Sequence, residues 1–132
     1  MKEIVQIVNS LRGILSLKPA TALQIADAEQ QLGVNFPDEY KEYLATFGAI
    51  MADGIELTGI AQSDHRNVIT VTKKEWELNP QIPHAMYVVE NTHIDGIIIW
   101  QDVHGLIYRS YPLSEAKQIA SSLGDYISRR TK

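Results

Sequence analysis

The spacing of apolar residues changes at Gly48 and changes back near the end of the chain. Before Gly48, apolar side chains recur at helical spacing in three segments, which predict helices at 2–16, 21–32 and 37–48. After Gly48, short runs rich in Val, Ile, Tyr and Trp are separated by turn residues, as in an antiparallel meander. Residues 113–130 again repeat like a helix. Helices, then strands, then a closing helix predict an α+β fold.

Local signals mark the ends of the second and third predicted helices. Thr21 and Gln24 have the spacing of a capping box, and Gly33 suits the left-handed residue that follows a helix. Pro37 suits a helix start, and Gly48 should end the third helix. The expected apolar stripe of the second helix is Leu23, Ile25, Ala28 and Leu32.

We expect one antiparallel-rich sheet of about four to six strands, built on residues 54–60, 85–90, 96–101 and 106–111. Its turns are the polar stretches "NTHIDG" and "DVHG". The C-terminal helix should pack on this sheet, with Ser114 as its N-cap. The buried stripe of that helix would be Ile119, Leu123 and Ile127.

Residues 66–78 carry two conflicting signals. The β-branched run from Val68 to Thr72 favours a strand. However, Val68, Thr72 and Trp76 also fall at i, i+4 and i+8, which is helical spacing. Residue pattern alone leaves helix and strand open for this segment.

Length and composition predict a single domain, residues 1–132. The chain has no cysteine, which excludes disulfides and thiolate metal ligands. No apolar run approaches the roughly 20 residues of a membrane span. The first residues include Glu3 and repeat like a helix, so we expect no signal peptide and a cytoplasmic protein.

The four histidines are the first candidates for metal binding. His93 and Asp95 form an H-x-D unit, and Asp102 and His104 form a D-x-H unit. The strand expected between them separates the units by roughly 20 Å, at about 3.4 Å per residue. One ion needs all its ligands within a few ångströms. We therefore predict two polar turns and no metal site.

Motifs for catalysis are also missing from the sequence. There is no G-x-S-x-G elbow, no S-x-x-K and no glycine-rich phosphate loop. The acids that follow Pro37 are expected to face water, where nothing raises a carboxyl pKa. We therefore expect neither a cofactor nor an enzymatic activity. An enzyme or small-molecule binder stays open as a less favoured class, which a pocket with a buried carboxylate would support.

Charge is unevenly distributed, although the net charge is only −4. Between Ile25 and Glu56 there are seven acids and one base, Lys41. This bias argues against nucleic-acid binding, which needs a basic face. A one-signed face can steer a basic partner, although a charge run is often only a solvated surface. The apolar residues of the third helix have core spacing; they are Tyr40, Tyr43, Leu44 and Phe47.

The segment "IADAEQQLGVNFPDEYKEYLATFGAI" resembles the signature of the SUKH superfamily. That signature has a helix with an I-x-x-x-E core, an LG-x-x-x-P break and a P-x-x-Y-x-x-[FY]-L helix that ends near a glycine. The matching positions are Ile25, Glu29, Leu32, Gly33, Pro37, Tyr40, Tyr43, Leu44 and Gly48. The later segments "GIELTGI" and "IPHAMYVVENTHIDGIIIWQD" resemble the family's next strands in order and spacing. The resemblance covers nearly the whole chain and implies a helix at 66–78.

The resemblance implies a protein–protein binding role. Bacterial members are immunity proteins that bind the C-terminal domain of a toxin, often a nuclease, and block it. Fungal relatives are non-enzymatic regulators of cell-wall assembly that act as scaffolds. The acid excess fits the first class, because a nuclease domain must be basic to hold a polyanion. We therefore expect an immunity protein, monomeric or weakly dimeric, with a regulatory scaffold as the alternative.

The predicted partner-binding residues are of two kinds. Five acids are expected to contribute to one acidic face; they are Asp38, Glu39, Glu42, Asp53 and Glu56. Exposed aromatic side chains of the sheet are expected to anchor the toxin domain; they are Tyr87, Trp100 and Tyr108. Neither nucleic acid nor a membrane is an expected partner.

Overall fold

The computed structural model describes residues 3–130, so the two ends of the predicted domain and the start of the first predicted helix lie outside the described residues. The helices are α1 (Ile4–Asn9), α2 (Ala22–Leu32), α3 (Asp38–Phe47), α4 (Val68–Leu78) and α5 (Leu123–Arg130), with a short 3-10 turn at Asp64–Arg66. The strands are β1 (Leu15–Ser16), β2 (Ile50–Ala52), β3 (Ile55–Glu56), β4 (Tyr87–Asn91), β5 (Ile98–Gln101), β6 (Ile107–Ser110) and β7 (Lys117–Ala120). The predicted α+β class is confirmed.

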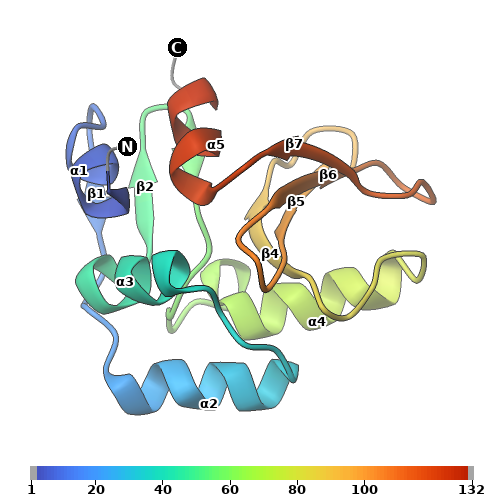
Figure 1. Cartoon of the computed structure of the whole chain (residues 1–132), viewed down its shortest axis with the longest axis horizontal. Coiled ribbons are helices and arrows are strands. Elements are labelled where there is room, and N and C mark those ends of the chain that lie inside the picture. Colours follow the sequence, from blue (N-terminus) through green and yellow to red (C-terminus); the bar gives the residue numbers. More distant parts are fainter. Residues whose placement is uncertain (1–2, 131–132) are drawn as a thin grey trace.

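The elements form two connected halves (Figure 1). In one half, α1, α3 and α5 gather around the small sheet of β1, β2 and β3. In the other half, the sheet of β4 to β7 curves above α4, which packs against β4. Helix α2 contacts both α3 and α4, so it runs beneath the junction of the two halves.

The strands form two antiparallel sheets instead of the single sheet expected. One has the order β1-β2-β3, and the other has the order β4-β5-β6-β7. The predicted strand 54–60 is wrong in extent, because only Ile55–Glu56 pair as a strand, and they pair with β2. The next two residues connect the two sheets. The amide of Leu57 donates to the carbonyl of Ile50 in β2, and the amide of Thr58 donates to the carbonyl of Val89 in β4.

Both terminal segments contain a strand where a longer helix was expected. Helix α1 ends at Asn9, and Gly13 adopts a left-handed φ of 69° that turns the chain into β1. Near the other end, Lys117–Ala120 form β7, which satisfies the backbone groups along one edge of β6. The last helix therefore begins only at Leu123, and its cap is Ser122 instead of Ser114, because the Ser122 hydroxyl accepts from the amide of Asp125 at 2.9 Å.

The ambiguous segment 66–78 is helical from Val68 to Leu78. Asn67 caps this helix, since its side-chain oxygen accepts from the amides of Ile69 at 2.9 Å and Thr70 at 3.4 Å. Packing against β4 outweighs the local strand preference of the β-branched run.

Helices α2 and α3 follow their sequence signals closely. Thr21 and Gln24 form the predicted capping box, and Gly33 has the expected left-handed conformation. The apolar stripe predicted for α3 is buried, with exposures of 5% or less. Leu23 is the exception on α2, because it is 83% exposed. It lies two positions before Ile25, which places it on nearly the opposite side of a helix with 3.6 residues per turn.

Glu75 of α4 is a buried acid, with 6% of its surface exposed. Its carboxylate accepts one hydrogen bond, from the Asn79 amide at 3.2 Å. Burial raises the pKa of Glu75 above its ordinary value of 4.5, against the opposing effects of Lys74, Asn79 and His93. The folded protein therefore holds this proton more tightly than the unfolded chain. The stability that this adds is complete below pH 4.5 and is lost as the pH rises through the raised pKa.

We expect Glu75→Gln to be more stable than the wild type at pH 7, because a neutral amide keeps the Asn79 contact without burying charge. The gain should disappear below pH 4.5, where Glu75 is neutral. Urea unfolding at several pH values measures this difference. The exposed acid Glu77 on the same helix gives a matched control, since Glu77→Gln should show no such gain. A Glu75→Gln protein that is less stable at pH 7 would contradict the assignment.

Candidate partner-binding surface

Glu39, predicted to face a partner, lies half-buried at the start of α5. One carboxylate oxygen accepts from the amide of Leu123 at 2.8 Å, and the other accepts from the amide of Gly124 at 2.9 Å. The Gln101 amide donates to the same carboxylate at 3.2 Å. These amides are the donors that a helix start leaves unpaired. Glu39 therefore caps α5 from another helix, and sequence reasoning missed this because the contact spans 85 positions of the chain.

The tyrosines of α3 carry a buried hydrogen-bond network that connects α3 with both sheets. The Tyr43 hydroxyl donates to the carbonyl of Thr58 at 2.8 Å and accepts from the amide of Ile50 at 3.0 Å. The Tyr40 hydroxyl lies 3.3 Å from the Thr58 hydroxyl, which donates to the carbonyl of Val88 at 2.8 Å. Burial raises the pKa of both tyrosines, so both hydroxyls stay protonated. This part of α3 is structural.

Two of the three predicted aromatic anchors are buried. Tyr87 and Trp100 each have 0% exposure, so the prediction that they are exposed is wrong. Tyr87 packs beside Tyr40 on the α3 side of the sheet, with ring centroids 4.9 Å apart. Trp100 packs with Val71 of α4 on the other side. Strands β4 and β5 are thus covered on both faces, whereas the prediction assumed that one face of the sheet is exposed to solvent. Tyr108 is partly exposed, and its hydroxyl donates to Asp102 at 3.0 Å.

The remaining acids fall into two groups. Asp38 and Glu42 are exposed on one face of α3, at i and i+4, and neither carboxylate has a partner among residues 3–130. Asp53 is exposed at the tip of the β2–β3 hairpin, and Glu56 follows it, half-buried. The carbonyl of Gly54 in this hairpin accepts a hydrogen bond from Arg130, the last residue of α5. Glu39 of α3 instead contacts Leu123, the first residue of α5. The two groups of acids therefore lie beside opposite ends of α5.

The histidines form no metal centre in the part of the chain that the structure describes. No cluster of three or more His, Asp or Glu side chains with ligand geometry occurs within residues 3–130. His93 and His104 lie in turns at opposite ends of β5, as expected. His84 stacks on Trp76, with ring centroids 4.2 Å apart.

A pocket of about 230 Å³ next to the β2–β3 hairpin contains the buried acid Glu90. Its carboxylate accepts hydrogen bonds from Tyr126 and from Arg130, whose two terminal nitrogens lie 3.0 and 3.2 Å away. Burial raises the pKa of Glu90, against the opposing effects of Tyr126 and Arg130. The buried carboxylate that would support a small-molecule site is present, but both oxygens are engaged in fastening α5 to β4.

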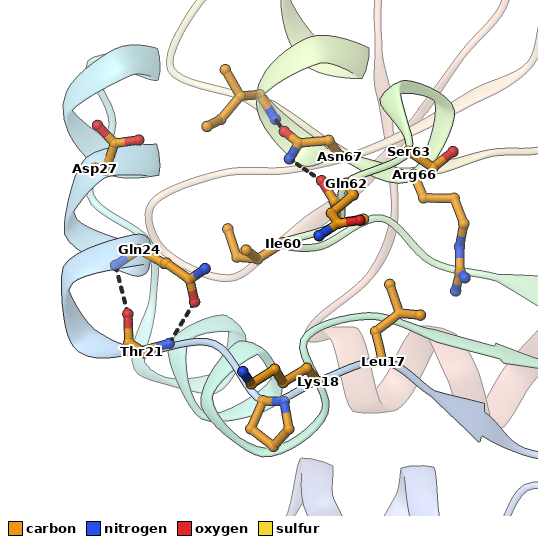
Figure 2. A pocket seen from close by; sticks show the side chains of 13 residues that line it. Leu17, Lys18, Thr21, Gln24, Asp27, Ile60, Gln62, Ser63, Arg66 and Asn67 are labelled. Atoms are coloured by element: carbon orange, nitrogen blue, oxygen red, sulfur yellow. Dashed lines mark hydrogen bonds between the residues drawn. The ribbon is translucent and has the colours of Figure 1, made fainter.

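A larger pocket, of about 640 Å³, opens between residues 17–24 and the loop 60–67 (Figure 2). It lies apart from the acids of α3 and was not predicted. Its lining combines apolar side chains, including Leu17, Pro19 and Ile60, with two cationic residues, Lys18 and Arg66.

A family model described as SMI1-KNR4 cell-wall, SUKH_5, matches residues 1–131. The chain belongs to the SUKH superfamily. A protein from Bacillus subtilis (strain 168), described as "Uncharacterized protein YnaB", is 49% identical over 43 residues. That match covers 32% of this SUKH chain and 30% of the length of YnaB.

A solved structure supports the same fold for this SUKH domain. A crystal structure of a protein from Pseudomonas syringae pv. tomato superimposes with a TM-score of 0.75. The superposition covers 95% of this chain and 93% of that chain, at 17% sequence identity. This likeness establishes the shared architecture.

The SUKH signature residues build the turn between α2 and α3. Gly33 turns the chain in a left-handed conformation, and the amide of Val34 donates back to the carbonyl of Glu29 at 3.1 Å. The Glu29 carboxylate accepts from the amide of Phe36 at 2.8 Å and lies 3.7 Å from the ammonium of Lys41. The glutamate of the I-x-x-x-E core is therefore a structural acid in this SUKH domain, as Glu39 is. Among residues 3–130, no helix is both long and apolar enough to cross a bilayer.

Proposed function

We propose that this SUKH domain is an immunity protein that binds the C-terminal domain of a cognate toxin in the cytoplasm and neutralises it without catalysis. Membership of the SUKH superfamily supports a role as an immunity protein or regulator. The observation that favours a basic toxin domain is the pair of exposed, unpartnered acids on α3, Asp38 and Glu42. A nuclease domain, which must hold a polyanion, has the complementary charge.

The structure narrows the acidic surface that this proposal uses. Glu29 and Glu39 do not contribute to this acidic surface, because their carboxylates accept backbone hydrogen bonds inside the domain. Lys41, the single base of this region, pairs with Glu29. Asp38 and Glu42 therefore present an uncompensated negative charge, which should act mainly on the rate of association.

We expect the double variant Asp38→Lys/Glu42→Lys to associate with a basic toxin domain about tenfold more slowly at low salt. The loss should shrink as salt rises, because exposed charges are screened over about 8–10 Å at physiological ionic strength. Dissociation should change less, and the free energy of unfolding should change by less than about 1 kcal/mol per site. Stopped-flow mixing at several salt concentrations measures both rates.

The matched control reverses two exposed acids elsewhere, in Glu77→Lys/Glu115→Lys. It changes the net charge equally but should leave association nearly as fast as in the wild type. The partner is found by co-expressing the chain with toxin domains encoded next to its gene and scoring cell survival. Equal effects of both double variants would mean that net charge alone acts. Binding that ignores salt and both double variants would exclude steering by α3.

A regulatory scaffold is the second candidate, because the matching family model is described as SMI1-KNR4 cell-wall. Gene order separates the two candidates: an adjacent toxin gene supports immunity, whereas the absence of one supports a scaffold.

A further inference from the structure

Two turns at one end of the sheet of β4 to β7 carry exposed apolar side chains. Residues 92–97 connect β4 with β5, and residues 111–116 connect β6 with β7, so the antiparallel strand order places both turns at the same end. Ile94 is 60% exposed in the first turn, whereas Tyr111 and Leu113 are 44% and 82% exposed in the second. In Figure 1 the connection between β6 and β7 projects beyond the strands. We call these two turns together the sheet tip.

The sheet tip is held in one shape by contacts within the domain. A Cβ atom on Gly96 would lie 2.7 Å from Cγ of Pro112, so the two turns pack closely against each other. The side-chain amide of Gln81, which precedes β4, donates to the carbonyl of Ser114 at 2.9 Å. A surface that is already ordered loses less conformational entropy when it binds a partner.

Backbone strain is concentrated in the sheet tip. Within residues 3–130, three non-glycine residues have a left-handed φ, and all three lie there: His93 at 58°, Asp95 at 53° and Leu113 at 62°. Histidine and aspartate adopt this conformation fairly readily, but a bulky leucine does so rarely and at a cost in free energy. The Leu113 side chain is mostly exposed, so packing inside the domain does not offset this cost. Burial of Leu113 against a partner would offset it.

Charges of both signs surround the apolar side chains of the sheet tip. Asp95 and Glu115 are exposed acids, and Lys117 is an exposed base. The guanidinium carbon of Arg109 lies 5.4 Å from the centroid of the Tyr111 ring. A basic toxin domain or an anionic membrane is attracted by a surface of one sign, so neither matches this balance. A second copy of the chain does match it, because a two-fold axis can bring the acids of one copy next to the bases of the other.

The sheet tip also lies away from the unpartnered acids of α3. The turn at the other end of β5 is fixed beside α3, because Gln101 donates both to the Glu39 carboxylate at 3.2 Å and to the carbonyl of Gly105 at 3.0 Å. Asp38, which precedes Glu39, is therefore near the opposite end of the sheet. The chain has a net charge of −4, so two copies repel each other least where they meet through a surface of balanced charge.

We propose that the sheet tip is the contact surface of a weak two-fold dimer of this chain, in which Ile94, Tyr111 and Leu113 of each copy are buried against the other copy. The surface is small, because the largest apolar patch on a typical monomer covers about 300–600 Å². A stable interface buries about 800 Å² per partner. The dimer should therefore have a dissociation constant on the order of 1 mM. The inference goes beyond the proposed function, because the dimer leaves the acids of α3 free for a toxin domain.

The test is a dilution series of the full chain followed by NMR, from about 2 mM to about 0.05 mM, a range that brackets this dissociation constant. We expect the backbone amide signals of residues 92–97 and 111–116 to shift with concentration, whereas those of α2 and α3 stay constant. The mean sedimentation coefficient should rise over the same range. Signals that do not depend on concentration would overturn the proposal, as would shifts confined to another surface.

A matched pair of variants separates the sheet tip from the rest of the surface. Leu113→Ser and Leu23→Ser each remove one exposed leucine, and the exposed fractions of the two side chains are 82% and 83%. We expect Leu113→Ser to weaken dimerisation at least about tenfold, since each copy loses a buried leucine. Leu23→Ser, on α2, should dimerise like the wild type. Equal weakening by both variants would overturn the proposal, because exposed leucines would then act without a defined surface.

Leu113→Gly tests the role of the strained residue. Glycine adopts a left-handed φ without strain, so this variant should unfold at no lower urea concentration than the wild type. It should nevertheless fail to dimerise. Strong destabilisation by Leu113→Gly would show that Leu113 supports the fold of the free domain, and the proposal would be wrong.

Two further measurements distinguish other partners of the sheet tip. Vesicles of phosphatidylcholine and phosphatidylglycerol should not bind the wild type. Vesicle binding that Leu113→Gly abolishes would overturn the proposal, because the sheet tip would then be a lipid-binding surface. Asp38→Lys/Glu42→Lys should dimerise at least as tightly as the wild type, so this test and that of toxin binding can fail independently.

Discussion

Replacing Tyr43 by alanine is expected to destabilise the protein by about 4 kcal/mol, which is typical for the loss of a fully buried aromatic ring. Tyr43 has 0% exposure and stacks on Tyr40, with ring centroids 5.5 Å apart. The change would also leave the amide of Ile50 and the carbonyl of Thr58 without their shared partner. Ile50 belongs to β2, and Thr58 lies in the segment after β3, where its own amide donates to Val89 of β4. The variant therefore loosens α3 from both sheets at once.

Urea denaturation of a short series measures this effect. Tyr43→Phe keeps the ring and removes only the hydroxyl, so it should cost about 1–3 kcal/mol, the penalty for unpaired buried groups. Tyr111→Ala is the exposed control and should cost less than about 1 kcal/mol, since that residue is 44% exposed. A Tyr43→Phe protein as stable as the wild type would show that the hydrogen bonds contribute nothing to the fold.

Replacing Glu39 by alanine is expected to cost about 3 kcal/mol, an unusually large effect for a half-buried acid in a first helical turn. Its carboxylate accepts hydrogen bonds from the first two amides of α5, those of Leu123 and Gly124, and each bond is charge-assisted. Removing it leaves two amides unpaired and also takes a partner from Gln101. Glu39→Gln should recover part of the loss, because an amide oxygen can still accept one of the bonds.

Glu42→Ala provides the control, because Glu42 is exposed on the same helix three residues later. Its free energy of unfolding should stay within about 0.5 kcal/mol of the wild type. Hydrogen exchange of the amides of residues 123–128 gives a second measurement, since Glu39→Ala should speed their exchange more than that of α2. Equal unfolding energies for the Glu39 and Glu42 variants would refute the capping role.

Features encoded by neighbouring residues were predictable from the sequence. The capping box at Thr21 and the left-handed Gly33 depend on contacts within one turn, and both occur as expected. The buried stripe of α3 depends only on helical spacing, and it too is confirmed. The superfamily signature gave the helix at Val68–Leu78, which the β-branched run alone left undecided.

Features that depend on distant pairing were not predictable in the same way. Strand β1 is two residues long and exists because it pairs with β2, which follows it by more than 30 positions. Trp100 looks like a surface aromatic in a half-exposed strand, and only the position of α4 shows that the strand is covered on both faces. Glu39 carries no local mark that distinguishes it from the exposed acid Asp38. The exposure of Asp38 and Glu42 was therefore predictable from the sequence, whereas the burial of Tyr87 and Trp100 was not.

The position of α5 has a consequence for the order in which the elements of this domain fold. An isolated helix of eight residues is too short to persist in water, so α5 forms only when Glu39 is already in place. In turn, Glu39 and Glu90 obtain their partners from residues 123–130. During translation we therefore expect both carboxylates to stay hydrated until residues 123–130 have left the ribosome and α5 can dock. Docking of α5 is thus expected to be a late step in the folding of this domain.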